Sequence, residues 1–422
     1  MIDAQGLVNL GKAAKVASRE LGKLPSQQKN AALLAMAKSL RDNQAAILVA
    51  NQADIENTRE AGRRPESFIE RMTLTESRID DMAAGFEKVA NLPDIIGQTD
   101  EMWFTEDGIE IGKKRVPLGV IGIIFESRPN VTADATALTF KAGNAVILRG
   151  GSETIQSNLA IIEAIKAGLS EAGVTIDAVN LIDNPDRALA TQFMQMNQYL
   201  DVLIPRGGAA LIQNVVKNAT VPTIETGIGN DHLYVHEAAD LDKALAILKN
   251  GKLQRVSVCN ALENLLVDEK VAEAFLPQIV ESFKADKVVV HGDQRTREIL
   301  QGKIDILPVN EEDYATEFLA YEIAIKVTSG YNEAIEHIQT YSSAHTEVIV
   351  TKDYSVARQF VDDIDAAAVV VNASSRFTDG DKFGFGGEIG ISTQKLHARG
   401  PMGIEALTTY KYVIYGDGQI RQ

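Results

Sequence analysis

The sequence predicts an α/β protein with two doubly wound domains and a small additional β element. Three observations support this fold class. The first hundred residues have a helical periodicity, and from residue 113 short apolar runs alternate with helical segments in two successive series. Two further segments, 105–116 and 407–415, are rich in β-forming residues and belong to neither series. Alternating strands and helices are typical of parallel sheets with helices on both faces.

The N-terminal region is predicted to be helical. Ser26 is a residue type that caps helices, because its hydroxyl can accept a hydrogen bond from a first-turn amide. After Ser26, the residues Leu33, Ala37, Leu40, Gln44 and Ile47 recur at spacings of three and four. This stripe predicts an amphipathic helix that buries one face.

The two series of apolar runs predict two parallel sheets. The first series comprises runs 120–125, 145–148, 179–182 and 202–204, with a helix predicted at 154–170. The second series comprises runs 232–235, 265–267, 287–290, 348–350 and 368–371. The segment 105–116 predicts a hairpin that turns at Gly108 or Gly112. Together with the β-rich tail, this hairpin is expected to form an appended sheet.

Charge and cysteine content exclude several classes of protein. Acidic residues outnumber basic ones 58 to 42, giving a net charge of −16, which argues against nucleic-acid and anionic-membrane partners. The N-terminus lacks the apolar core of a signal peptide, and no run reaches the roughly 18 apolar residues that span a bilayer. One cysteine permits no internal disulfide, which indicates a reducing cytoplasm. The six histidines and the cysteine lack metal-ligand spacing, so no metal site is expected.

Three glycine turns follow apolar runs and are candidates for phosphate binding. They are ILRGGSET, LIPRGGAALI and TIETGIGNDHLYV. In the first two, an arginine and paired glycines stand between a strand and a helix, where free amides and the helix dipole attract phosphate. Tight turns that need glycine only for their backbone angles are the alternative interpretation. The absence of GxGxxG argues against an ordinary Rossmann dehydrogenase.

Cys259 is the candidate nucleophile. It is flanked by polar Ser257 and Asn260, which suits a reactive thiol on a loop. A thiolate attacks acyl carbon and leaves a thioester that accepts hydride, so a thiol and a nicotinamide suffice for acyl reduction. The alternative is a small buried apolar residue. Asn130, in FESRPNV, has an amide that could stabilise an oxyanion, or it could simply cap a helix.

The segment 371–403 is a candidate ligand-facing loop. It is dense in glycine and hydroxyl residues and also carries Arg376, Lys395, His397 and Arg399. Loops with many special backbone positions and charges are more often functional than merely solvated.

Several of these segments resemble the aldehyde dehydrogenase superfamily, and within it the enzymes that reduce γ-glutamyl phosphate in proline biosynthesis. The resemblance rests on VPLGVIGIIFESRPNVTADAT, KAGNAVILRGGSE, IETGIGN, VNASSRFTDG and STQKLHARGPMG, in the family's order. It implies an aldehyde-dehydrogenase-like fold, with a transient contact to the glutamate kinase that makes the substrate. The appended hairpin and tail predict a homo-oligomer. The implied domains are a dinucleotide-binding domain at 1–103 and 118–235, a catalytic domain at 236–400, and an oligomerisation hairpin and tail at 104–117 and 401–422.

The resemblance also implies a role for each site residue. Cys259 would form a thioester that NADPH reduces, and Asn130 with the Cys259 amide would form the oxyanion hole. Residues for the adenosine ribose and its 2′-phosphate would be Arg149, Gly150, Gly151 and Ser152. Gly207 and Gly208 would lie near the pyrophosphate, and Glu317 and Phe318 beside the nicotinamide ribose. The substrate would be bound by Arg128, Lys395, His397 and Arg399.

Three positions keep alternatives open. Glu225 stands where oxidising aldehyde dehydrogenases keep the base that activates water; we interpret it as structural or as a proton relay, and an oxidising enzyme is the alternative. Many relatives have a proline where Val256 stands, so the loop before Cys259 is expected to be more mobile. Many also have a second cysteine where this chain has Asp231, a carboxylate that either tunes the site or is exposed. Besides the reductase and the oxidising enzyme, the third hypothesis is a non-catalytic oligomer that protects the acyl phosphate.

Overall fold

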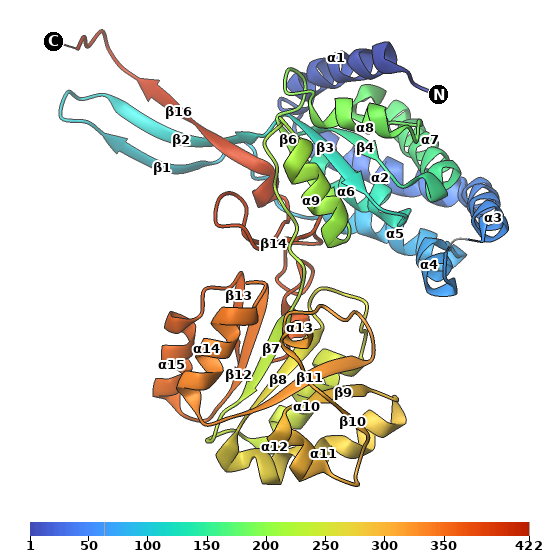
Figure 1. Cartoon of the computed structure of the whole chain (residues 1–422). Coiled ribbons are helices and arrows are strands. Elements are labelled where there is room, and N and C mark those ends of the chain that lie inside the picture. The colour runs from blue at the N-terminus through green and yellow to red at the C-terminus, as the bar shows by residue number, and fades with distance from the viewer. Residues whose placement is uncertain (63, 422) are drawn as a thin grey trace. The chain divides into compact units, whose positions relative to one another are not determined.

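The computed structural model describes residues 1–62 and 64–421, and the chain divides into two compact units (Figure 1). Unit 1 contains Met1–Thr226, Gly384–Gly390 and Met402–Gln422, and unit 2 contains Gly227–Phe383 and Ile391–Pro401. The expected boundary after residue 235 is therefore too late. The reason is that strand β7 (Asp231–Val235) pairs with strands of unit 2 and not with the first sheet.

Unit 1 begins with five helices: α1 (Ala4–Leu21), α2 (Ser26–Asp42), α3 (Gln44–Ala61), α4 (Glu66–Met72) and α5 (Glu76–Ala90). The apolar stripe predicted from the sequence is buried, but it spans two helices, because α2 ends at Asp42 and Ile47 belongs to α3. The capping role expected of Ser26 is wrong. Pro25 occupies the N-cap position, and Ser26 is the first helical residue.

The sheet of unit 1 has four parallel strands in the order β5-β4-β3-β6. They are β3 (Val120–Phe125), β4 (Ala145–Arg149), β5 (Val179–Leu181) and β6 (Val202–Arg206), and they match the predicted runs. The accompanying helices are α6 (Asn130–Lys141), α7 (Ile155–Glu171), α8 (Arg187–Met194) and α9 (Ala209–Asn218). Strand order reverses between β3 and β6, and ligands of open α/β sheets bind at the carboxyl ends of strands beside such a point.

A three-stranded antiparallel sheet extends from unit 1 in the order β1-β2-β16 (Figure 1). Its strands are β1 (Thr99–Phe104), β2 (Glu110–Pro117) and β16 (Thr408–Tyr415). The hairpin turns at Gly108, whose φ of 74° favours glycine, and the hairpin starts earlier than predicted. The expected pairing of hairpin and tail is confirmed, since β16 pairs with β2 along its whole length.

Unit 2 has a seven-stranded parallel sheet in the order β10-β9-β11-β8-β7-β12-β13. Besides β7, its strands are β8 (Leu262–Asp268), β9 (Val289–Gly292), β10 (Ile306–Pro308), β11 (Glu322–Thr328), β12 (Thr346–Val350) and β13 (Ala368–Val371). Its helices are α10 (Leu241–Leu253), α11 (Glu269–Ala285), α12 (Gln294–Leu300), α13 (Glu311–Tyr314), α14 (Tyr331–Tyr341) and α15 (Tyr354–Asp363).

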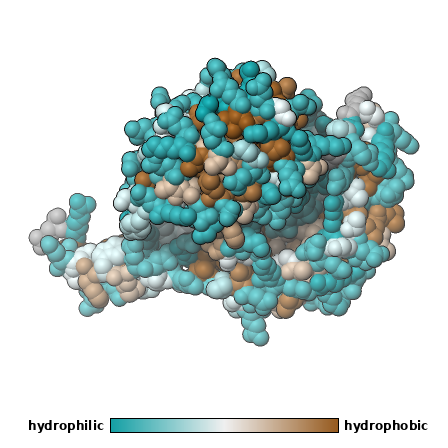
Figure 2. All heavy atoms as spheres, turned by 90° about the horizontal axis from the view of Figure 1, so that it is seen from below, coloured by the Kyte–Doolittle hydropathy of each residue, from teal (hydrophilic) through white to brown (hydrophobic). Residues whose placement is uncertain are grey.

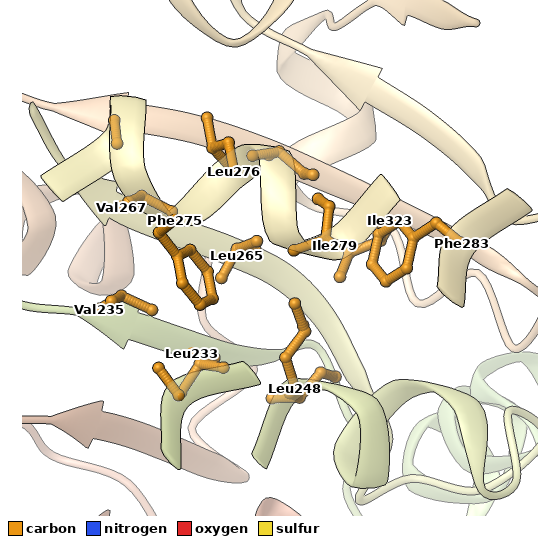
Figure 3. Close-up of a cluster of buried hydrophobic side chains, with 14 of the residues drawn as sticks. Leu233, Val235, Leu248, Leu265, Val267, Phe275, Leu276, Ile279, Phe283 and Ile323 are labelled. Carbon is orange, nitrogen blue, oxygen red and sulfur yellow. The ribbon is translucent and has the colours of Figure 1, made fainter. Parts of the chain in front are cut away.

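The core of unit 2 holds its central strands rigidly. Leucines and valines of β7 and β8 pack against α10 and α11, where Leu248 and Phe275 point into the cluster (Figure 3). A second cluster covers the other face of the sheet with residues of α14 and α15. Strands covered on both faces are almost continuously apolar, which is why the sequence reveals them. This packing fixes the strand ends, where the polar residues of the site lie.

The face shown in Figure 2 is mostly hydrophilic, with hydrophobic side chains in separate groups. Within residues 1–62 and 64–421, no helix has the length and apolar character needed to cross a membrane.

Candidate active site

The carboxyl ends of the unit 1 strands hold the residues predicted to bind the cofactor. Arg149 is the last residue of β4, and the turn after it leads through a short 3₁₀ segment, Ser152–Thr154, into α7. Gly207 and Gly208 connect β6 to α9. Strands β4 and β6 flank β3 in one parallel sheet, so the two turns lie at the same edge of that sheet.

Both turns need glycine for close packing. A Cβ at Gly207 would lie 2.7 Å from the Glu126 side chain, and one at Gly151 would lie 2.5 Å from the hydroxyl oxygen of Ser127. The amide of Gly208, which caps α9, donates a 3.0 Å hydrogen bond to the carboxylate of Glu126. The N-terminus of α9 therefore already holds an anionic group, which is what a helix N-terminus favours.

Arg149 presents an unused donor at this edge. Its Nη2 atom donates to the carbonyl oxygens of Pro185, at 3.2 Å, and Asp186, at 3.3 Å. Its Nε atom is buried and has no hydrogen-bond partner among the described residues. Burial lowers the pKa of Arg149, and the charge of Asp186 opposes that effect. A fixed guanidinium with an unsatisfied donor suits a phosphate or other anion.

Asn130 is the first residue of α6, and Pro129 before it takes the cap position. The alternative that Asn130 is a plain helix cap is therefore wrong. Its exposed amide nitrogen donates a 2.9 Å hydrogen bond to Asp134. Arg128 lies in the preceding turn, where its amide donates to the Glu126 carbonyl oxygen at 2.7 Å. Asn130 belongs to unit 1 and Cys259 to unit 2, so their shared oxyanion hole stays a prediction.

Cys259 lies on the loop between α10 and β8 and is partly exposed. It belongs to no hydrophobic cluster described for unit 2, unlike the buried apolar cysteine of the alternative interpretation. The backbone of Gly229 packs directly on this loop, because a Cβ at Gly229 would overlap the carbonyl oxygen of Cys259. The carbonyl group of Cys259 is thus held by the GIGN turn.

Asp231 is fully buried at the start of β7, which excludes the exposed alternative for this carboxylate. Its Oδ1 atom lies 3.2 Å from Nδ1 of His345, a side chain that is also fully buried. His345 was missed by the sequence interpretation. The only signal for it was its place directly before a predicted strand, and its partner lies far away along the chain.

Glu317 and Phe318, predicted to lie beside the nicotinamide ribose, precede β11. Glu317 accepts a 2.7 Å hydrogen bond from the amide of Gly229, and Phe318 stacks on His291 with ring centres 5.3 Å apart. The structure therefore ties Glu317 to the turn that packs on the Cys259 loop.

Arg376 is a further basic residue near the thiol, although the prediction included it only within a ligand-facing segment. Its Nε atom donates to the Gln254 side chain at 3.1 Å, and its Nη1 atom is buried without a partner among the described residues. Burial lowers the pKa of Arg376, as does Arg255, whereas the charges of Cys259 and Asp231 act in the opposite direction. This guanidinium is positioned for an anion close to Cys259.

The predicted substrate residues at 395–399 already have polar partners within the protein. Lys395 and Arg399 both form ion pairs with Asp365, the latter at 2.7 Å, and lower the pKa of that carboxyl. His397 accepts a 2.8 Å hydrogen bond at its carbonyl oxygen from the Gln394 side chain.

Glu225 lies in unit 1, in the loop after α9. Over the described ranges, no group of three or more His, Cys, Asp and Glu is arranged for a metal ion.

The fold and these sites define a member of the aldehyde dehydrogenase family. A family model described as "Aldehyde dehydrogenase family" matches residues 3–302, and the chain belongs to that family. Its particular similarity is to γ-glutamyl phosphate reductases. It is 55% identical over 415 residues to the one from Carboxydothermus hydrogenoformans, covering 98% of this chain and 99% of the relative. It is 53% identical to the one from Lachnospira eligens, covering 99% and 100%.

Solved structures agree with the fold. The crystal structure of γ-glutamyl phosphate reductase from Thermotoga maritima matches with a TM-score of 0.94 and 48% identity, covering 99% of this chain and 100% of that one. An acetylating aldehyde dehydrogenase from Geobacillus thermoglucosidasius matches with a TM-score of 0.70 and 19% identity, which shows the fold alone. The predicted fold class and family resemblance are confirmed.

Proposed function

We propose that this protein reduces γ-glutamyl phosphate, which is L-glutamate 5-phosphate, to L-glutamate 5-semialdehyde with release of phosphate. This reaction is the second step of proline biosynthesis from glutamate. The observation that carries the proposal is the sole thiol, Cys259, on a partly exposed loop in a chain that matches γ-glutamyl phosphate reductases over nearly its whole length.

The chemistry needs one covalent intermediate. The Cys259 sulfur forms a bond to the acyl carbon, the bond from that carbon to the phosphate oxygen breaks, and inorganic phosphate leaves. The nicotinamide cofactor, when bound, supplies the hydride that reduces the resulting thioester. Cys259 is then expelled from the thiohemiacetal as the aldehyde forms. The Asn130 amide and the Cys259 backbone amide are proposed to stabilise the oxyanion at each addition step.

NADPH is the proposed cofactor, and unit 1 offers groups that fit it. The buried Nε of Arg149, which has no hydrogen-bond partner in the described part of the chain, supports binding of a 2′-phosphate, with Gly150, Gly151 and Ser152 forming the adjacent turn. The glycines at 207 and 208 are proposed to lie near the pyrophosphate, which would compete with the Glu126 carboxylate for the Gly208 amide at the α9 N-terminus. In unit 2, Glu317 and Phe318 are proposed to contact the nicotinamide ribose.

The substrate carries several anionic groups, which the proposal assigns to basic side chains. Arg128, Lys395, His397 and Arg399 are proposed to bind its carboxylates and phosphate. Because Lys395 and Arg399 share Asp365 in this structure, a substrate anion would compete with that carboxylate. Arg376, whose buried Nη1 has no hydrogen-bond partner within residues 1–62 and 64–421, is proposed to assist the departing phosphate.

The protein is proposed to act in the cytoplasm as a homo-oligomer. The three-stranded sheet supports the latter, because Trp103, Phe104, Tyr412 and Ile414 expose hydrophobic side chains on it. Exposed apolar groups of this kind mark protein interfaces. A transient contact with glutamate kinase would shorten the path of the labile acyl phosphate. Sedimentation of the wild type and of Trp103→Ser tests the oligomer, and a monomeric wild type would refute it.

The reverse reaction tests the function. We expect phosphate-dependent oxidation of glutamate 5-semialdehyde, faster with NADP⁺ than with NAD⁺, and no activity in Cys259→Ala. Equal rates with both nucleotides would refute the NADPH preference. Formation of glutamate without added phosphate would instead support an oxidising aldehyde dehydrogenase, and loss of that activity in Glu225→Gln would identify its base. Full activity of Cys259→Ala would refute the thioester.

A further inference from the structure

The amino-terminal edge of the unit 2 sheet gathers three polar residues from distant parts of the chain. Strand β7 lies between β8 and β12, and all three strands are parallel. Asp231 is the first residue of β7, Cys259 lies on the loop that leads into β8, and His345 directly precedes β12. Parallel neighbours begin at the same edge, so the thiol, the imidazole and the carboxylate are brought together by strand order.

The carboxylate and the imidazole form a fixed pair. His345 Nδ1 lies 3.2 Å from Asp231 Oδ1, and the same oxygen accepts a 3.1 Å hydrogen bond from the amide of Thr346. The Thr346 hydroxyl lies 2.8 Å from His345 Nδ1. Both side chains of the pair are fully buried, which prevents water from replacing either partner. Only Nδ1 is occupied, because His345 Nε2 is buried without a hydrogen-bond partner among the described residues.

The turn before Asp231 is clamped on both sides. The Gly229 backbone packs on the Cys259 carbonyl group, and the Asn230 amide donates a 2.9 Å hydrogen bond to the Ser343 hydroxyl. The Asn230 side chain donates to the carbonyl oxygen of Tyr341 at 2.7 Å. One short segment therefore holds the Cys259 loop and the segment that ends at His345 in a fixed relation.

The electrostatic surroundings favour a charged imidazole. Burial alone would lower the pKa of His345, but the charges of Asp231 and Cys259 raise it well above its usual value. Burial raises the pKa of Asp231 to about 6; His345 opposes this shift and Glu347 adds to it. Glu347 is itself held 3.0 Å from His232 Nδ1. Beside the ionised Asp231, which holds Nδ1, a neutral His345 is therefore a strong base towards an acidic proton that reaches Nε2.

We propose that His345 is the counter-ion of Cys259: its Nε2 accepts the proton of the thiol, and Asp231 is the positioning residue that holds the imidazole through Nδ1. The S–H bond breaks as the N–H bond forms, so the sulfur becomes a thiolate and His345 an imidazolium. The proton remains on His345 while the thiolate attacks the acyl carbon and phosphate leaves. When Cys259 is expelled as a thiolate, the ion pair is restored. This inference deepens the proposed function, because it concerns the nucleophile of that reaction.

Alkylation of the only cysteine tests the proposal without any substrate. The rate of reaction with iodoacetamide is measured against pH for the wild type, His345→Gln and Asp231→Asn. Free thiols have a pKa of about 8.5, so we expect the wild type to stay reactive well below that pH and to lose reactivity near pH 6, as Asp231 is protonated. In His345→Gln the rate at pH 7 should fall about tenfold or more, which corresponds to a shift of one pH unit in the profile. Asp231→Asn should give a smaller shift in the same direction.

His337→Gln is the matched control. His337 is another buried histidine of unit 2, packed between Tyr314 and Tyr341, and burial lowers its pKa to about 2. Its alkylation profile should match that of the wild type. A wild-type profile like that of a free thiol, or unchanged profiles in a folded His345→Gln, would overturn the proposal; the wild-type measurement decides the case if the variants do not fold. If the profiles shift as expected but the wild type does not reduce γ-glutamyl phosphate, the proposed substrate is refuted and the ion pair stands.

Discussion

The carboxylate of Glu317 accepts a 2.7 Å hydrogen bond from the amide of Gly229, whose backbone lies against the carbonyl oxygen of Cys259. A residue expected beside the cofactor therefore also supports the turn that holds the nucleophile loop. Glu317, Gly229 and Cys259 all lie in unit 2, so this relation does not depend on unit 1. Removing the carboxylate is expected to disturb the thiol as well as the cofactor.

Glu317→Ala is expected to lower kcat about tenfold or more, because a hydrogen bond to a charged group contributes about 1.5–3 kcal/mol. Glu317→Gln keeps an oxygen acceptor for Gly229 and should lose less. The measurements are kcat, KM for NADPH, and the rate of Cys259 alkylation. If the glutamine and alanine variants alkylate at the wild-type rate, Glu317 does not position the loop.

Gly229→Ala tests the close packing on Cys259 directly. Its methyl group would overlap the Cys259 carbonyl oxygen, so the loop must move. Forced overpacking costs about 1–3 kcal/mol, and we expect a loss of that size in unfolding free energy together with a severe loss of activity. Denaturant unfolding and steady-state kinetics measure the two effects.

Gly85→Ala provides the comparison. Gly85 lies inside α5, and a Cβ there has no neighbour closer than Asp134 Oδ1 at 3.9 Å. Alanine in an open helix interior should stabilise the protein by about 0.5–1 kcal/mol and leave activity unchanged. Equal effects of the two substitutions would show that Gly229 is not specially constrained.

The sequence predicted the four strands of the unit 1 sheet and five of the seven strands of the unit 2 sheet, but it missed β10 and β11. Most of the predicted strands are buried on both faces, which makes their sequences almost continuously apolar. Leu265 and Val267 of β8, for example, are fully buried within a run that has few polar interruptions. The prediction of boundaries failed where two apolar segments are adjacent in the sequence. The break between α2 and α3 at Asn43 does not interrupt the stripe, and β7 directly follows the loop that ends unit 1.

The site was predicted in part, for a similar reason. Cys259 and the glycine turns stand out locally, but the pairing of Asp231 with His345 follows from the register of β7 against β12. Strand order across a sheet joins residues that no local pattern connects. The ion pairs of Asp365 with Lys395 and Arg399 were missed on the same grounds.

Asp134→Asn is expected to change the pH dependence of stability. Burial raises the pKa of Asp134 to about 6, while Asn130 and Arg206 act to lower it. A raised carboxyl pKa means that its stabilising contribution is present below about pH 4 and is lost as the pH rises through 6. The asparagine avoids that loss, so the variant should gain about 1–3 kcal/mol relative to the wild type above pH 6 and little at pH 4. Thermal unfolding across this range measures it, and a constant difference would contradict the shift.

Lys252 and Glu263 form a buried ion pair, with Nζ and Oε2 2.6 Å apart and both side chains fully buried. Glu263 also accepts a 3.2 Å hydrogen bond from the amide of Leu319, next to the proposed cofactor residues. Lys252→Met leaves a buried carboxylate unpaired and should cost about 3–5 kcal/mol of unfolding free energy. Adding Glu263→Gln removes the charge and keeps an acceptor for Leu319, so the double variant should recover much of the loss. Denaturant unfolding of the single and double variants decides the matter: if the double variant is no more stable than Lys252→Met, the cost does not arise from the unpaired charge.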